Sequence, residues 1–94
     1  EAELAIYRVA QEALTNVVRH AGARHAALAL VPAAGAIELA VRDDGCGIPA
    51  SLPPGSSGIR GMRERALLVG AELTVAPRTE GGTEVRLRVP AAAR

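Results

Sequence analysis

The stretch from residue 43 to residue 58 constrains the fold most, because its composition rules out a regular element in the middle of the chain. It begins Asp-Asp-Gly-Cys-Gly-Ile-Pro and ends Pro-Pro-Gly-Ser-Ser-Gly, and such runs of glycine, proline, serine and aspartate favour loops. In a chain of 94 residues, a loop of this length is uncommon unless it binds a ligand or acts as a lid. The sequence therefore predicts one small domain in which two ordered segments flank a binding loop.

Before this loop, the pattern predicts a helix followed by a hairpin. Residues 4 to about 21 contain no glycine or proline, and their apolar residues recur at three- and four-residue steps, which is typical of an amphipathic helix. Gly22 is well placed to end that helix. Small and β-branched residues over 25–31, a turn at 32–35 and alternation over 37–42 then predict two paired strands.

After the loop, the same order returns. Residues 59–69 have helical composition and end at Gly70. Residues 73–75 and 85–89 alternate as strands do, about a glycine-containing turn at 78–82. The predicted order is helix, hairpin, loop, helix, hairpin.

Composition excludes several classes of function. All 11 basic residues are arginine. The chain therefore lacks the lysine that is essential in a Walker-A loop, in a eukaryotic-type protein kinase and in a pyridoxal enzyme, and these three classes are excluded. Cys46 is the one cysteine, which excludes an internal disulfide and a zinc site of paired cysteines. A net charge of +1 and an aromatic content of 1% argue against nucleic acid as a partner.

Three polar residues line one ridge of the first predicted helix. Glu12, Asn16 and His20 are four apart, so each is rotated by roughly 40° from the last. An asparagine oxygen suits Mg²⁺, whose shell is usually completed by phosphates and water, and Glu12 could orient or deprotonate a nucleophile. For any one of them alone, the simpler interpretation is that Glu12 and Asn16 are solvated residues at the edge of the core and that His20 is a cation at the end of the helix.

The loop after the second strand carries a carboxylate among glycines. Asp43 ends the strand, and Gly45 and Gly47 follow at alternate positions, where the backbone must turn tightly or approach a ligand. A carboxylate there can accept a hydrogen bond from an exocyclic amine such as that of adenine. Asp-Gly is equally common as a plain turn, so this alternative stays open.

Two further glycines, Gly58 and Gly61, open the second predicted helix. Free N–H groups at a helix N-terminus form an anion site, for which phosphate is the natural ligand. The alternative is that both glycines belong to the loop and have no ligand. Thr83, which follows two glycines, could add a hydroxyl to the same phosphates or could simply begin a strand.

These segments follow one another in a specific order: Glu-x-x-x-Asn, Asp-x-Gly-x-Gly, a glycine-rich lid, a glycine-opened helix and Gly-Thr before the last strand. The order resembles the sequence boxes of the GHKL ATPase superfamily. Through Gln11–Ala21 and Gly58–Ala66, the chain is most similar to the catalytic ATP-binding domain of bacterial sensor histidine kinases of the nitrate-sensor/DesK-like subclass. The resemblance covers nearly the whole chain, from about Leu4 to Pro90.

The resemblance implies an α/β (α+β) two-layer sandwich of the Bergerat type, with helices on one face of a mixed β-sheet. It implies a domain spanning residues 1–94 that binds ATP with Mg²⁺, in which Asn16 holds the ion and Glu12 assists the in-line transfer. Asp43 would accept from the adenine amine. The other implied ligand-binding residues are Arg19 and His20 near the phosphates or ribose, Gly45, Gly47 and Ile48 at the base, Gly58, Ile59, Gly61 and Met62 on the phosphate side, and Thr83 closing the site.

Two parts of the family pattern do not occur in this sequence: the first strand, just upstream of the first helix, and the dimerisation region that bears the phospho-acceptor histidine. His20 and His25 do not replace that histidine, because one lies in the first box and the other begins a strand. The resemblance therefore implies a monomeric domain that donates the ATP γ-phosphoryl to a histidine elsewhere in a homodimeric parent. The implied partners are that acceptor domain and a response regulator, and the implied location is cytoplasmic, with a membrane anchor allowed in the parent.

Two other functions fit parts of the pattern. An anti-sigma-factor serine kinase shares the first two boxes, but the Gly-Met-Arg-Glu-Arg-Ala segment argues against it. A non-catalytic nucleotide-binding interaction module is the second alternative, although Asn16 and Asp43 are both present. Finally, residues 49–57 hold too few apolar anchors to offset the entropy of ordering the backbone, which predicts a lid that becomes ordered on the triphosphate.

Overall fold

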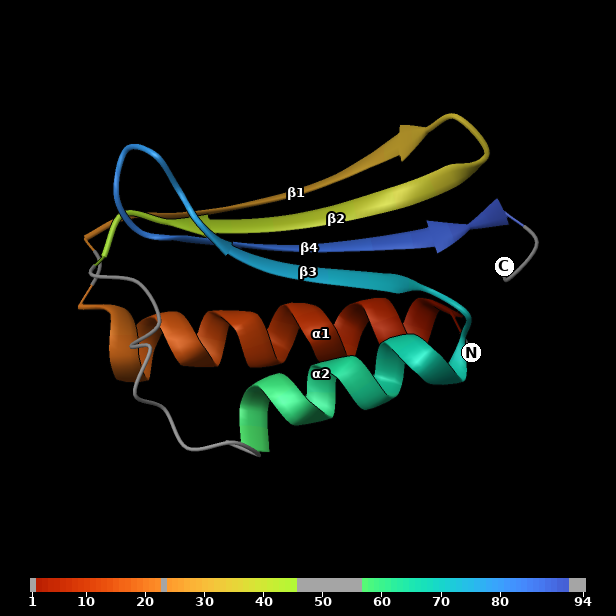
Figure 1. Ribbon diagram of the computed structural model, residues 1–94, viewed down its shortest axis with the longest axis horizontal. Helices are drawn as coiled ribbons and strands as arrows, with labels where there is room; N and C mark the ends of the chain where they lie inside the picture. Colours follow the sequence, from red (N-terminus) through yellow and green to blue (C-terminus); the bar gives the residue numbers. More distant parts are fainter. Residues whose placement is uncertain (1, 23, 46–56, 92–94) are drawn as a thin grey trace.

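The computed structural model describes residues 2–22, 24–45 and 57–91, which form two layers (Figure 1). Two helices lie against one face of a four-stranded sheet. In chain order the elements are the α-helix α1 (Ala2–Asn16), the π-helix η1 (Val17–Ala21), the strands β1 (Ala26–Ala33) and β2 (Ala36–Asp43), the α-helix α2 (Ser57–Leu68), and the strands β3 (Glu72–Pro77) and β4 (Thr83–Pro90). The predicted order of helix, hairpin, helix and hairpin is confirmed.

Helix α1 is amphipathic and places small side chains against the sheet. Ala2, Ala5, Val9 and Ala13 are buried, and Ala2, Val9 and Ala13 belong to the core that the helix shares with the strands. After Asn16 the chain continues as the wider turn η1, and Gly22 ends it in the left-handed conformation with φ 59°. The predicted glycine stop is confirmed, but the switch to π-helical bonding was not expected, because apolar spacing identifies a helical face and not the hydrogen-bonding pattern.

All neighbouring strands in the described sheet run antiparallel, in the order β1-β2-β4-β3. The expected two-layer sandwich with the helices on one face of the sheet is confirmed. The sheet was expected to be mixed, but the described strands contain no parallel pair. The topology gives the reason. Each hairpin pairs its own two strands, and the second hairpin joins the first through β4, which runs opposite to β2.

The strands extend further into the first hairpin turn than the composition predicted. Pro32 and Ala33 belong to β1, where Pro32 lies opposite Ile37, so that the turn contains only Ala34 and Gly35. Gly35 has φ 68°, a conformation that favours glycine. Proline is tolerated within this ladder because β1 is an edge strand.

The hydrophobic core lies between the helices and the middle of the sheet. Leu39, Val41 and Leu87 from the strands meet Val9 of α1 and Met62 of α2, and all five are almost fully buried. In β4, buried and half-buried residues alternate along the whole strand, as expected for a strand with one covered face. The core therefore fixes which face of β2 and β4 the helices cover.

The helices do not cover strand β1. Leu28 and Leu30 are opposite the buried residues Val41 and Leu39 and so share their face of the sheet. They nevertheless remain 49% and 52% exposed. The helices thus cover β2, β4 and β3 but leave the β1 edge open.

Candidate nucleotide-binding site

The predicted site elements gather at one end of the two layers, on the left in Figure 1. The end of α1, the turn η1 and the start of α2 lie there in the helix layer, while the end of β2 and the turn between β3 and β4 lie there in the sheet. Motifs that are far apart in the sequence are therefore brought to one end of the fold.

Asp43 and Thr83 are the two buried polar or charged residues among those described, each 5% exposed. The outermost pair between β2 and β4 joins Arg42 to Glu84, so Asp43 and Thr83 occupy the next position on each strand. Alternation along the strands places both on the face that the helices cover. Since burying polar groups is costly unless they are hydrogen-bonded, their shared placement marks this sheet end as a candidate site.

The carboxylate of Asp43 is oriented by its own turn. Its Oδ1 accepts a hydrogen bond from the backbone N–H of Gly45 at 2.9 Å, the geometry of an Asx turn. Gly45 therefore takes part in the candidate site through its backbone N–H, which holds the Asp43 carboxylate. Gly47 and Ile48, which were also predicted to shape a base pocket, lie outside the described residues, as does the predicted lid at 49–57 except for its last residue, which begins α2.

At the end of α1, the structure brings some predicted residues together and separates others. Glu12 and Asn16 are both partly buried within α1, whereas Arg19 is exposed on η1. His20 lies in η1 by its backbone, and its side chain is outside the description. Because η1 is π-helical, the ridge predicted from α-helical spacing is continuous only from Glu12 to Asn16.

Helix α2 begins at the same end and contains Gly58, Ile59, Gly61 and Met62. Met62 is 0% exposed in the core and Ile59 packs partly buried against it, so their side chains anchor the helix. Gly61 faces open space, because a Cβ added there would have no heavy atom of another element within 4 Å.

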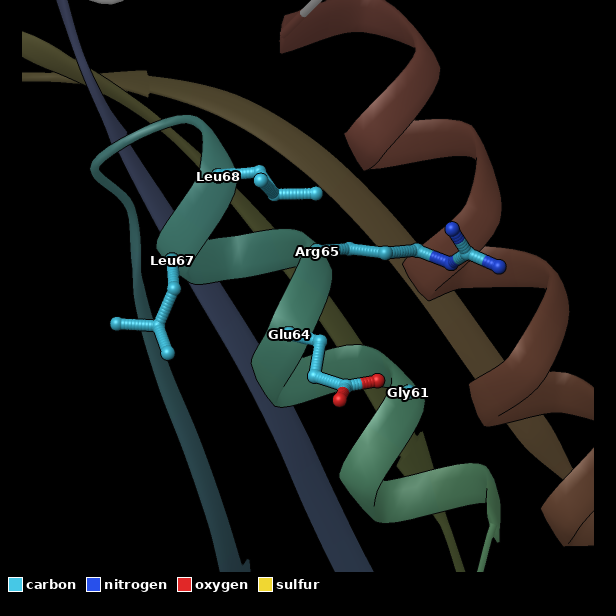
Figure 2. A pocket seen from close by; sticks show the side chains of 5 residues that line it. All are labelled: Gly61, Glu64, Arg65, Leu67 and Leu68. Carbon is cyan, nitrogen blue, oxygen red and sulfur yellow. The ribbon is translucent and has the colours of Figure 1, made fainter.

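A shallow hollow of about 520 Å³ runs along α2 and is lined by Gly61, Glu64, Arg65, Leu67 and Leu68. Figure 2 shows Arg65 extending from α2 toward α1, with Leu68 on the same side and Leu67 on the other. Leu67 and Leu68 are 78% and 84% exposed. The hollow includes one predicted site residue, Gly61, and follows the helix away from the Asp43 end, so it does not define the nucleotide site.

Asp44 has a role that the sequence interpretation missed. Its Oδ1 accepts hydrogen bonds from the backbone N–H groups of Arg24 and His25, each at 2.9 Å, and its Oδ2 lies 2.9 Å from His25 Nδ1. The hydrogen bonds from the backbone and then the ring of His25, aided by that from Arg24, lower the pKa of Asp44 to about 2. Asp44 therefore links the residues that precede β1 to the end of β2. The sequence feature that could have indicated this role is the second aspartate before Gly45.

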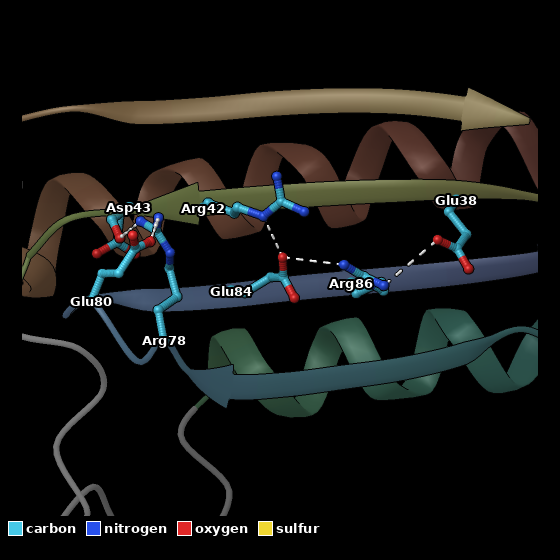
Figure 3. A network of polar contacts seen from close by, with 7 residues as sticks. All are labelled: Glu38, Arg42, Asp43, Arg78, Glu80, Glu84 and Arg86. Carbon is cyan, nitrogen blue, oxygen red and sulfur yellow. Dashed lines mark hydrogen bonds and ion pairs between the residues drawn. The ribbon is translucent and has the colours of Figure 1, made fainter.

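The outer face of the sheet carries a row of ion pairs (Figure 3). Arg42 pairs with Glu84, which also contacts Arg86 at 3.3 Å, and Arg86 reaches Glu38 at 3.8 Å. The hydrogen bond from Arg42 holds the pKa of Glu84 below its ordinary value. These charged side chains lie on the face of the sheet opposite the helices, where they are partly exposed to solvent and separate from the candidate site.

The residues at this end are chemically suited to a magnesium nucleotide. In the described part of the chain, no group of three or more His, Cys, Asp or Glu side chains could hold a metal ion. Mg²⁺ in nucleotide sites usually takes one or two protein oxygens together with phosphate oxygens and water, and the partly buried amide of Asn16 fits that mode.

Within the described ranges, no helix is long and apolar enough to cross a membrane.

Comparisons with known proteins identify the family of this chain. Residues 1–93 match the family model described as histidine kinase-, DNA gyrase B-, and HSP90-like ATPase. Sensor histidine kinase YxjM of Bacillus subtilis is 40% identical over 85 residues, which are 90% of this chain and 20% of that protein. Sensor protein NarQ homolog of Haemophilus influenzae is 36% identical over 87 residues, which are 90% of this chain and 15% of that protein.

A solved structure supports the same relationship. The blue-light activated histidine kinase EL346 of Erythrobacter litoralis superposes with a TM-score of 0.76 and 33% identity, over 89% of this chain and 30% of that chain. These relatives favour the predicted sensor-kinase resemblance over the serine-kinase alternative. The chain thus spans 20% or less of the two curated relatives, and it belongs to the histidine kinase-, DNA gyrase B- and HSP90-like ATPase family as an ATP-binding domain of the kind found in sensor histidine kinases.

Proposed function

We propose that residues 1–94 form the catalytic domain of a sensor histidine kinase, which binds ATP with Mg²⁺ and donates the γ-phosphoryl group to a histidine outside this chain. The observation that carries the proposal is the burial of Asp43 and Thr83, each 5% exposed, at the end of the sheet where α1 ends and α2 begins. A small number of buried polar groups that converge on one place is typical of a ligand site.

In this proposal Asp43 accepts a hydrogen bond from the exocyclic amine of adenine. Its Asx turn leaves Oδ2 free of the Gly45 contact, which engages Oδ1. Gly45, Gly47 and Ile48 shape the base pocket. The phosphates lie toward the N-terminus of α2, whose free N–H groups favour an anion. Gly58 and Ile59 form that side at the start of the helix, Gly61 leaves open space beside it, Met62 supports it from the core, and Thr83 closes it.

Catalysis in this site consists of positioning and charge neutralisation, which dominate phosphoryl transfer in general. Asn16 would hold Mg²⁺, which neutralises phosphate charge when bound. Glu12, one turn earlier on the same ridge, orients the attacking nucleophile, and Arg19 and His20 stand near the phosphates or ribose. None of these roles needs a lysine, which the chain lacks.

The proposed setting follows from the same family membership. The acceptor histidine belongs to a dimerisation domain of the same kinase, so the parent protein is a homodimer, and a response regulator receives the phosphoryl group from it. We place this domain in the cytoplasm, where ATP is available.

Titration calorimetry of the folded 94-residue chain with ATP, with and without Mg²⁺, tests the proposal. Asn16→Ala should weaken Mg²⁺-dependent ATP binding by about tenfold or more, the usual size of losing a metal-site partner. Gln11→Ala is the matched control, because it removes an amide from an exposed position on the same helix. A folded sample that gives no heat with ATP, or equal losses in the two variants, would contradict the proposal.

A further inference from the structure

The turn between β3 and β4 reaches back to the backbone of Asp43. Residues 78–82 form a closed turn, in which the N–H of Arg78 donates to the carbonyl of Gly82 at 3.0 Å and the N–H of Gly81 donates to the carbonyl of Arg78 at 3.1 Å. The turn therefore has a defined shape of its own, and its position relative to β2 is set by the β2–β4 pairing.

Arg78 joins this turn to the end of β2 (Figure 3). Its Nη1 donates a hydrogen bond to the carbonyl oxygen of Asp43 at 2.8 Å, and its Nη2 pairs with Glu80 at 3.3 Å. The Arg78 side chain is 27% exposed, whereas that of Glu80 is 82% exposed. Since an exposed ion pair contributes little, the contact to Asp43 is the one that has a structural effect.

The same peptide is held from its other side. Asp44 donates its N–H to the carbonyl of His25 at 3.2 Å, so both polar groups of the Asp43–Asp44 peptide have partners, on different elements. Gly82 closes the remaining space, because a Cβ at that position would lie 1.9 Å from the Asp43 carbonyl oxygen. The backbone of Asp43 is thus clamped between the start of β1 and the β3–β4 turn.

We propose that Arg78 is a positioning residue for nucleotide selection: by holding the carbonyl of Asp43, it aims the Asp43 carboxylate at the base. This inference rests on the proposed base-reading role of Asp43. The peptide orientation of Asp43 sets the direction of its side chain and of the Asx turn that ends at Gly45. Arg78 does not itself contact the nucleotide in this scheme.

The chain contains a matched control at the opposite end of the sheet. Arg88 donates from Nη2 to the backbone carbonyl of Ala34 in the first hairpin turn at 3.0 Å, and from Nη1 to Glu38 at 3.0 Å. It therefore makes the same two kinds of contact as Arg78, with a carbonyl and a carboxylate. Its carbonyl partner lies in a turn that is remote from Asp43.

The test measures dissociation constants of Mg-ATP and Mg-GTP by calorimetry for the 94-residue chain and its Arg78→Ala and Arg88→Ala variants. Arg78→Ala should lower the preference for ATP over GTP by about tenfold, the value of one hydrogen bond made by a charged donor. Arg88→Ala should keep the preference within about twofold while lowering the melting temperature to a similar extent. Arg78→Lys should recover most of the preference, because one ammonium donor can replace the single guanidinium donor to Asp43.

A second readout follows the turn directly. The Gly45 amide resonance in a ¹⁵N spectrum should move in Arg78→Ala and stay in place in Arg88→Ala, because that N–H donates to Asp43. If both arginine variants lower the preference equally, or if Arg78→Ala changes neither the preference nor the resonance, the positioning role is wrong. If Arg78→Ala does not fold, Arg78→Met replaces it, because methionine keeps an unbranched side chain of similar length but has no hydrogen-bond donor for the Asp43 carbonyl, and an unchanged preference in Arg78→Met overturns the inference.

Asp43→Ala separates this inference from the function on which it rests. If Asp43→Ala retains the ATP preference of the parent, base reading by Asp43 is wrong, and the inference about nucleotide selection falls with it. If Asp43→Ala loses the preference while Arg78→Ala retains it, base reading stands and only the role of Arg78 is wrong.

Discussion

Gly82→Ala should destabilise the protein more than the same substitution at the neighbouring Gly81, and the difference measures the contact with Asp43. Both glycines have positive φ, 99° for Gly81 and 91° for Gly82, so both substitutions carry a backbone cost of about 1–3 kcal/mol. No heavy atom lies within 4 Å of a Cβ at Gly81, whereas at Gly82 the Asp43 carbonyl oxygen lies at 1.9 Å and the Asp44 Cα at 3.0 Å.

The obstructing atoms at Gly82 belong to backbone, so they cannot rotate away as a side-chain tip could. Forcing extra atoms into such a space typically costs about 1–3 kcal/mol more. For a domain of this size, each 1 kcal/mol lowers the melting temperature by roughly 4–8 °C. Gly82→Ala should therefore melt at least about 4 °C below Gly81→Ala.

Thermal and urea unfolding of the two variants and the parent provide the measurement. The urea m-value should be the same in all three, which shows that the native and unfolded states stay comparable. Binding gives an independent reading: Gly82→Ala should also weaken ATP binding, because the methyl group displaces the Asp43 peptide, and Gly81→Ala should not. Equal melting temperatures for the two variants would refute the close contact between the β3–β4 turn and Asp43.

Three further predictions concern the acidic residues. Asp43→Ala should abolish the discrimination between ATP and GTP, measured as the ratio of their dissociation constants, whereas an unchanged ratio would show that the base is read elsewhere. The hydrogen bonds from His25 and Arg24 lower the pKa of Asp44 to about 2 from 3.8, so its stabilising effect is complete above about pH 4 and is lost as the pH falls through 2; the melting temperatures of the parent and Asp44→Asn should differ at pH 6 and converge near pH 2, and a constant difference would argue against the ionised contact. Glu12→Ala should spare ATP affinity and reduce phosphoryl transfer in a full-length kinase by about 10²-fold or more, and a variant that loses affinity instead would assign Glu12 to binding.

The order of elements could be predicted because it depends on local patterns. The three- and four-residue spacing in α1, the stops at Gly22 and Gly70, and the alternation in β4 each arise from residues close together in the sequence. Both glycines have the left-handed conformation expected for helix C-caps, with φ 59° and 67°. Local geometry decides such features, so composition and spacing are sufficient to predict them.

The pairing of the sheet could not be predicted in the same way. Nothing in the local pattern says that β4 inserts between β2 and β3, which makes all described pairs antiparallel. Likewise, alternation in β2 marks a half-buried strand, but it does not show that β1 stays open at the edge with Leu28 and Leu30 about half exposed. The strand order depends on pairing between segments that are distant in the sequence, and the exposure of β1 depends on how far the two helices extend across the sheet.

The candidate site likewise contains residues that a local sequence pattern predicts and residues that only the tertiary structure brings together. Asp43 has a local signal, because a carboxylate followed by alternate glycines is visible in a few residues, and Thr83 follows a glycine pair. The groups that hold Asp43 in place come from Arg78 and from the chain around His25, which are remote in the sequence and meet Asp43 and Asp44 only through the register of β1, β2 and β4. A substitution at position 78 would leave every predicted sequence box intact and still release the Asp43 carbonyl, so nucleotide selectivity in this domain should depend on residues that the boxes do not contain.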